Sequence, residues 1–131
     1  MTASAPLRQL ARATWTHVAF AFLAMGAWSA FANRDHGAAA MLRAFVVQGA
    51  LSGLITLVLK RWLEAAHRRL NGPLGRILPP VASCIAIAAL LSLLHRLAGT
   101  PEILRTIAVP WSVSTLYAFA YTLSLPKERP A

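Results

Sequence analysis

The spacing of charged residues restricts the fold of this chain more than any motif does. Residues 13–33 and 77–95 contain no Asp, Glu, Lys or Arg and are rich in apolar side chains. A helix of about 20 residues rises roughly 30 Å, which matches the hydrocarbon thickness of a bilayer. We therefore predict transmembrane helices at 13–33 and 77–97, the second of them with Pro79 and Pro80 in its first turn, where their missing N–H groups need no intrahelical partner.

A third apolar stretch, residues 41–63, is also long enough to cross a bilayer but carries polar side chains. Residues at four-residue steps lie on one face of a helix. The polar residues at these steps are Gln48, Ser52, Thr56, Lys60 and Glu64. A basic segment, residues 64–76, is expected to follow as a cytoplasmic loop.

The start of a fourth transmembrane helix is predicted at Thr100, Pro101 and Glu102. Thr100 suits the N-cap, Pro101 the first helical position, and Glu102 the positive end of the helix dipole. The helix is expected to span residues 101–125, with Pro110 inside it, because Pro110 lies too close to the end of the apolar stretch to begin a spanning helix.

The composition agrees with this assignment. Hydrophobic residues make up 57% of the chain and charged residues 13%, which is outside the range of soluble domains. The formal net charge of +9 would suggest a nucleic-acid partner in a soluble protein. Here most basic residues flank apolar stretches, so we expect anionic lipid headgroups as partners and no nucleic acid. The predicted fold class is an all-α integral membrane protein, with residues 1–131 as one four-helix transmembrane domain.

Residues 13–33 also permit a different interpretation, a cleaved signal peptide. Basic residues precede the apolar stretch, and Ala30-Phe31-Ala32 resembles a cleavage site. The apolar stretch exceeds the usual core of about 7–15 residues, which favours a transmembrane helix.

The orientation follows from the distribution of basic residues between the two sides. With four helices, nine basic residues fall on the side of both termini and four on the other. The positive-inside rule then places both termini in the cytoplasm, and we expect the location to be a bacterial inner membrane.

An internal repeat is visible when the chain is shifted by 62 residues. Residues 37–47 then align with residues 99–109, so that Gly37 matches Gly99 and Arg43 matches Arg105. This alignment would make the chain two parallel helical hairpins related by an axis along the membrane normal. A shared need to re-enter the membrane after a short turn explains the same matches.

Enzyme motifs are absent from the sequence. There is no HExxH, CxxC, P-loop or GxSxG pattern, and none of the four carboxylate residues lies inside an apolar stretch. The four histidines and Cys84 lack the spacing of a metal site. We therefore expect no catalytic residues, no metal and no cofactor.

The polar face of residues 41–63 is the first candidate site. Gln48 needs a partner on another helix, and Gly49 and Gly53 allow a neighbouring backbone to approach for helix packing. The face either holds helices together or lines a polar pathway with Ser52 and Thr56 as hydrogen-bonding groups and Lys60 as its cytoplasmic cation. The expected facing surface, on the fourth helix, consists of Ser114, Tyr117 and Tyr121.

The second candidate site is an anion site formed by Arg43 and Arg105. Each lies near a helix start, where a cation is disfavoured by the dipole unless an anion such as a lipid phosphate is bound. Snorkelling of both side chains to lipid phosphate explains the same pattern.

Two functions fit these features. One is a homo-oligomeric, non-enzymatic transporter or flippase-like protein for an amphipathic or anionic lipid-linked substrate. The other is an accessory or assembly subunit that binds a larger membrane protein through the polar face of the second helix. A membrane enzyme has little support.

Overall fold

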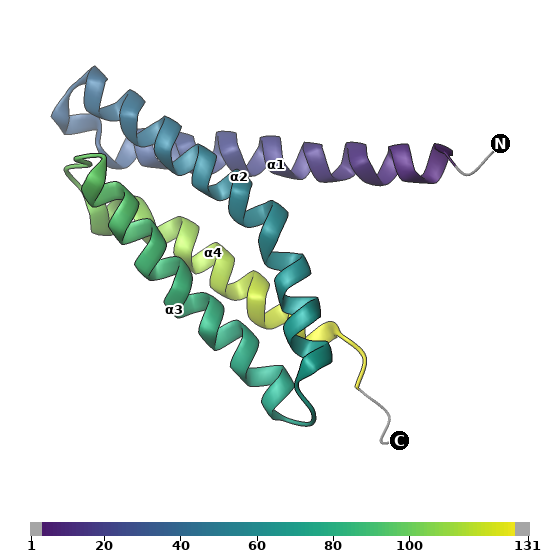
Figure 1. Ribbon diagram of the computed structural model, residues 1–131. Coiled ribbons are helices and arrows are strands. Elements are labelled where there is room, and N and C mark those ends of the chain that lie inside the picture. The colour runs from purple at the N-terminus through teal and green to yellow at the C-terminus, as the bar shows by residue number, and fades with distance from the viewer. Residues whose placement is uncertain (1–3, 128–131) are drawn as a thin grey trace.

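The computed structural model describes residues 4–127, which form four long helices and one short 3-10 helix (Figure 1). Their bounds are Ser4–Ala32 for α1, Arg34–His36 for η1, Ala38–Arg69 for α2, Leu74–Leu97 for α3 and Ile103–Ser124 for α4. Each long helix contains a segment long and apolar enough to cross a membrane, which in α1 is Arg12–Ala32. The prediction of an all-α chain with four such helices is confirmed. Residues 1–3 and 128–131 of the predicted domain 1–131 lie outside the described residues.

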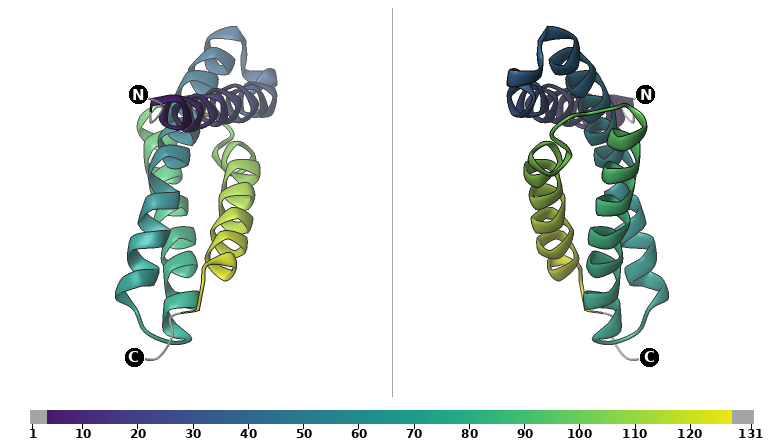
Figure 2. Two further views of the ribbon diagram at one scale, coloured as in Figure 1. Left: turned by 90° about the vertical axis from the view of Figure 1, so that its right-hand side faces the viewer. Right: turned by 90° about the vertical axis from the view of Figure 1, so that its left-hand side faces the viewer.

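The helices pack as two hairpins, α1 with α2 and α3 with α4 (Figures 1 and 2). The two hairpin turns, residues 33–37 and 98–102, lie together at one end of the molecule, which we call the turn end. The connection from α2 to α3 lies at the opposite, basic end, which carries Arg68, Arg69 and Arg76. The N-terminal half of α1 diverges from α3 and α4 as it leaves the turn end (Figure 1).

Glycines bring α1 and α2 into close contact. A Cβ atom at Gly26 would lie 3.0 Å from the carbonyl oxygen of Phe45, and one at Gly49 would lie 3.0 Å from that of Phe22. The rings of Phe22 and Phe45 pack edge to face at 5.8 Å. At Gly53 the approach is looser, since a Cβ would lie 3.3 Å from Cγ1 of Val18. This hairpin therefore depends on residues without a side chain.

Asn33 joins the two hairpins at the turn end. Its Nδ2 donates to the Ser29 carbonyl and to Oγ1 of Thr106, both at 2.8 Å, and its Oδ1 accepts from the backbone N–H of Glu102 at 3.0 Å. Asn33 is fully buried. The end of α1 is thereby fixed to the beginning of α4.

Four helix boundaries differ from the prediction by three residues or more, among them the start of α2, which lies at Ala38 rather than at residue 41. Helix α1 begins at Ser4 rather than at residue 13, and α2 continues to Arg69, so residues 64–69 of the predicted loop are helical. Helix α3 begins at Leu74, three residues before the predicted start at 77. Charged residues can extend a helix beyond the hydrocarbon, and an apolar pattern does not mark that extension.

The earlier start of α3 places Pro79 and Pro80 inside the helix rather than in its first turn. Pro79 has no N–H to donate to the carbonyl of Gly75, four residues earlier. That carbonyl instead lies 3.0 Å from Nδ1 of His67, which is buried at the end of α2. A side chain from the neighbouring helix thus replaces the backbone donor that proline lacks.

The predicted N-cap of α4 is also wrong. Helix α4 begins at Ile103 with Glu102 in the N-cap position, and Thr100 and Pro101 precede it. The hydroxyl of Thr100 is 2.8 Å from Nδ1 of His95, and its backbone N–H donates to the His95 carbonyl at 3.0 Å, so Thr100 closes the end of α3 rather than capping α4. Pro110 lies inside α4, as predicted.

Candidate functional site

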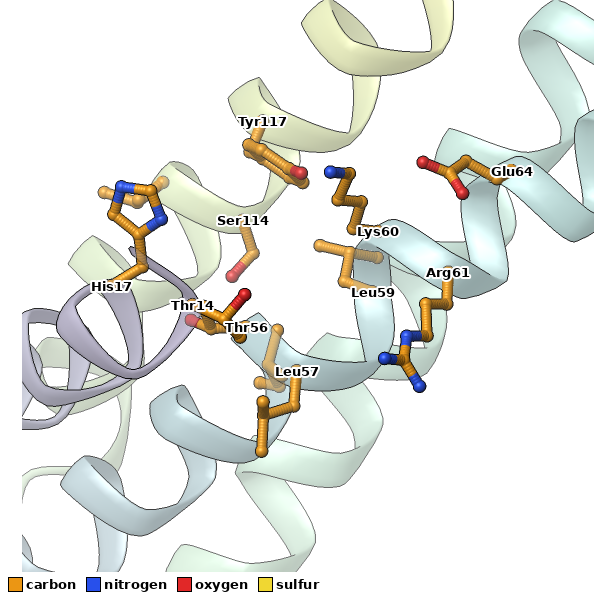
Figure 3. A pocket seen from close by; sticks show the side chains of 12 residues that line it. Thr14, His17, Thr56, Leu57, Leu59, Lys60, Arg61, Glu64, Ser114 and Tyr117 are labelled. Carbon is orange, nitrogen blue, oxygen red and sulfur yellow. The ribbon is translucent and has the colours of Figure 1, made fainter. Parts of the chain in front are cut away.

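A cavity of about 520 Å³ lies between α1, α2 and α4 (Figure 3). We call it the polar cavity. Its polar lining residues are Thr14 and His17 from α1, Thr56, Lys60, Arg61 and Glu64 from α2, and Ser114 and Tyr117 from α4. Its apolar lining residues are Ile55, Leu57, Leu59 and Val113.

The polar cavity exists because α1 stays close to α2 only near the turn end. The tight contacts at Gly26 and Gly49 give way to the looser contact at Gly53, and beyond it α1 diverges from α4 (Figure 1). The space left between the diverging helices is bounded by the next turns of α2, which carry Thr56 and Lys60. Helix packing near the turn end therefore places the cavity in the half of the molecule nearer the basic end.

The charge of the polar cavity is positive. Lys60 and Arg61 are exposed, and within residues 4–127 neither of them lies within ion-pair distance of a carboxylate. Among the described residues, Glu64 is the only carboxylate that lines the cavity, and it accepts a hydrogen bond from the hydroxyl of Tyr121 on α4. The lining thus holds two cations and one carboxylate that already has a partner.

Two tyrosines form the α4 side of this arrangement. The rings of Tyr117 and Tyr121 are stacked, with centroids 5.5 Å apart and planes 5° apart. Nζ of Lys60 lies 5.8 Å from the ring centroid of Tyr121, within reach of a cation–π interaction. Figure 3 shows Lys60 and Tyr117 converging from α2 and α4.

A second group of polar side chains lies outside the cavity, between α2 and α3. Gln48 and His95 are fully buried, with Nε2 of His95 2.9 Å from Oε1 of Gln48. Nε2 of Gln48 donates to Oγ of Ser52 at 2.8 Å, and Nδ1 of His95 is 2.8 Å from the hydroxyl of Thr100. A neutral histidine that donates from Nε2 and accepts at Nδ1 satisfies every member of the chain. We call these four residues the buried chain.

The structure divides the predicted polar face between these two groups. Thr56, Lys60, Ser114 and Tyr117 line the cavity, and Tyr121 contacts both Lys60 and Glu64. Gln48 and Ser52 belong to the buried chain, so the expectation that helix 4 faces them is wrong for Gln48, whose partner is His95 of α3. At about 3.6 residues per turn, three steps of four residues rotate the face by roughly 120°, so Gln48 and Lys60 meet different neighbours.

The two arginines predicted as an anion site are both exposed near the turn end. Nη1 of Arg43 lies 3.8 Å from the position that a Cβ of Gly99 would take. The backbone carbonyl of Arg105 accepts a hydrogen bond from Nε1 of Trp28 at 2.9 Å. Their role in binding a headgroup stays a prediction.

Several residues of both groups were not predicted. Thr14, His17 and Arg61 line the cavity, and no periodicity marks them because the divergence of α1 is a tertiary feature. His95 offered a clearer signal, since a histidine within an apolar stretch, like Gln48 in another, needs a hydrogen-bonding partner. Within residues 4–127, no three His, Cys, Asp or Glu side chains lie close enough together to hold a metal ion.

Fold and cavity together are those of a small α-helical protein with four candidate membrane-spanning helices, consistent with an integral membrane protein. No family model, curated protein or solved structure matches the chain.

Proposed function

We propose that this protein is a non-enzymatic transporter or flippase-like protein of the bacterial inner membrane that binds an amphipathic anionic substrate in the polar cavity. The observation that carries the proposal is Lys60, which points toward Tyr117 and has no carboxylate within ion-pair distance among the described residues (Figure 3). Arg61, also without such a carboxylate, is a second cation of the cavity lining. An anionic headgroup would accept charge-assisted hydrogen bonds from Lys60, and Arg61 would add positive charge.

The lining of the cavity suits a headgroup that is joined to an apolar chain. Hydroxyl groups of Thr56, Ser114 and Tyr117 lie beside the cations, whereas Ile55, Leu57 and Val113 form an apolar wall. A cavity between two diverging transmembrane helices can accept a lipid from the side, with its tail left in the bilayer. This arrangement favours a lipid-linked anion over a small hydrophilic ion.

The proposed orientation places both termini and the basic end in the cytoplasm. Nine basic residues, among them Arg68, Arg69 and Arg76, fall on this side of the chain and four on the other. The polar cavity would then lie in the cytoplasmic half of the bilayer. A homo-oligomer of parallel hairpin repeats would supply the remainder of a pathway, since one chain of this size provides few helices to enclose it.

The proposal is tested with purified protein in phosphatidylcholine liposomes that contain a trace of fluorescent phosphatidylglycerol. We expect the protein to accelerate movement of the probe between leaflets, measured by dithionite quenching. The variant Lys60→Gln/Arg61→Gln should slow this movement about tenfold or more, because a charge-assisted hydrogen bond and a second positive charge are lost.

The matched control is Arg68→Gln/Arg69→Gln, which removes the same charge from the same end of the molecule but outside the cavity lining. It should retain most of the wild-type rate. If both double variants lost the same share of the rate, the effect would come from surface charge in general rather than from the cavity, and the proposal would be contradicted.

An accessory subunit is the second candidate function, and the N-terminal half of α1 favours it. This half diverges from the other helices (Figure 1) and exposes Trp15. Gln48 and Ser52 are buried within the chain, so a larger partner would have to bind elsewhere. A monomer that moves no lipid and co-purifies with one larger membrane protein would support this function instead.

A further inference from the structure

Lys60 and Glu64 of α2 do not form the ion pair that their spacing allows. Residues four positions apart lie one turn apart on the same face of a helix, where opposite charges usually attract. Within residues 4–127, the ion pair that meets a 4.0 Å limit is the one between His36 and Glu102 at the turn end. The carboxylate of Glu64 instead accepts a hydrogen bond from the hydroxyl of Tyr121.

Tyr121 also contacts the other member of the missing pair. Its ring lies 5.8 Å from Nζ of Lys60, while its hydroxyl is bound to Glu64. One tyrosine therefore holds the carboxylate at its polar end and the ammonium over its face. The ammonium keeps N–H donors for a ligand, because a cation–π contact is made with the ring face and leaves the cation without a hydrogen-bond acceptor.

The position of Tyr121 is fixed by packing. The ring stacks on Tyr117 and packs against the apolar core formed by α2, α3 and α4. Two residues of this core, Leu59 and Leu63, lie within one helical turn of Lys60 on α2. The tyrosine hydroxyl is thus presented to Glu64 by a rigid surface rather than by a free side chain.

We infer that Tyr121 is a positioning residue: it holds Glu64 away from Lys60 and so keeps the Lys60 ammonium available to an anionic ligand in the polar cavity. The link to a ligand rests on the proposed function. The link between the three side chains does not, and it can be measured without any lipid.

The lipid-free measurement uses amine labelling of Lys60. The chain has two lysines, Lys60 and Lys127, so Lys127 serves as the internal reference in each sample. In Tyr121→Phe the ring and its stacking are kept but the hydroxyl is lost, and Glu64 is free to pair with Lys60. Labelling of Lys60 relative to Lys127, read by mass spectrometry, should fall about threefold, as expected for a partly exposed ion pair.

The decisive variant is Glu64→Gln/Tyr121→Phe, in which no carboxylate is left to pair with Lys60. Labelling should return to the wild-type value, a rescue that a merely structural role of Tyr121 would not produce. If Tyr121→Phe does not fold, Glu64→Gln alone decides: Lys60 labelling should stay unchanged, because the wild-type carboxylate is not paired with it. A rise in labelling in Glu64→Gln, or unchanged labelling in folded Tyr121→Phe, would overturn the inference.

The ligand-dependent measurement is the affinity for phosphatidylglycerol in phosphatidylcholine vesicles, followed by quenching of a fluorescent phosphatidylglycerol. Tyr121→Phe should weaken binding about threefold, and it should have no further effect in a Lys60→Gln background. Wild-type protein that shows no preference for phosphatidylglycerol would overturn the proposed function and leave the labelling result standing. Wild-type binding that Tyr121→Phe does not change would overturn the inference alone.

Discussion

Nε2 of His95 lies 2.9 Å from Oε1 of Gln48, and both side chains have no solvent-exposed surface. This contact joins α2 to α3 in the part of each helix that would lie within or near the hydrocarbon. Removal of one partner leaves Nε2 of His95 or Oε1 of Gln48 without its hydrogen bond, and water is not available there to replace the lost partner. The contacts of Gln48 with Ser52 and of His95 with Thr100 remain.

The first prediction concerns this contact. Gln48→Leu or His95→Leu should each lower the free energy of unfolding by about 1–3 kcal/mol, measured by denaturant titration in detergent micelles. The double variant Gln48→Leu/His95→Leu should lose less than the sum, because each single variant already breaks the one hydrogen bond that joins the two side chains. Additive losses would show that the two side chains are not coupled.

The glycines between α1 and α2 give the second prediction. A Cβ at Gly49 would lie 3.0 Å from the backbone oxygen of Phe22, which cannot move without moving α1. A Cβ at Gly53 would lie 3.3 Å from Cγ1 of Val18, a side-chain atom that can move. Gly49→Ala should therefore destabilise the protein by about 1–3 kcal/mol and Gly53→Ala by less.

The control for the glycine variants is Ala50→Val, which adds bulk to the exposed side of the same helix. Thermal unfolding in one detergent compares all three. Equal midpoints for Gly49→Ala and Ala50→Val would contradict the close approach of α1 and α2.

The third prediction concerns Asn33 at the turn end. Its Oδ1 accepts from the backbone N–H of Glu102, so Asn33→Leu should expose this amide to exchange. Hydrogen exchange of a peptide covering residues 98–106, measured by mass spectrometry, should become faster. Asn33→Asp keeps the acceptor but loses the donor to Thr106, and it should protect the Glu102 amide better than Asn33→Leu does. Asp35→Asn, at an exposed position of η1, is the control.

The sequence predicts the four helices well because an apolar stretch of about 20 residues has few other solutions. It also predicts the residues of the polar face, since these depend on spacing along one helix. The partner of Lys60, Tyr121, lies on the predicted facing surface of the fourth helix. The partner of Gln48, His95 of α3, could not be predicted, because only the packing shows that Gln48 and Lys60 meet different helices. Thr100 illustrates a different limit, since its capping signal for α4 was outweighed by another local contact, with His95 five residues earlier at the end of α3.

The last prediction concerns His67, which connects three segments at the basic end. Its Nδ1 lies 3.0 Å from the carbonyl oxygen of Gly75, to which Pro79 has no N–H to donate. Its Nε2 lies 3.1 Å from the carbonyl oxygen of Pro126. His67→Leu removes both contacts, and a neutral imidazole donates to one of the two carbonyl oxygens, a hydrogen bond worth about 1 kcal/mol. The chain after α4 should then detach from α2, while α4 itself stays folded through its contacts at the turn end.

A spin label at Lys127→Cys in a Cys84→Ser background reports whether the chain after α4 detaches, since Cys84 is the only native cysteine. The label should become more mobile in His67→Leu but not in Arg68→Leu, a change at the next and exposed position of α2. Equal mobility in both variants would mean that His67 does not hold the segment after α4.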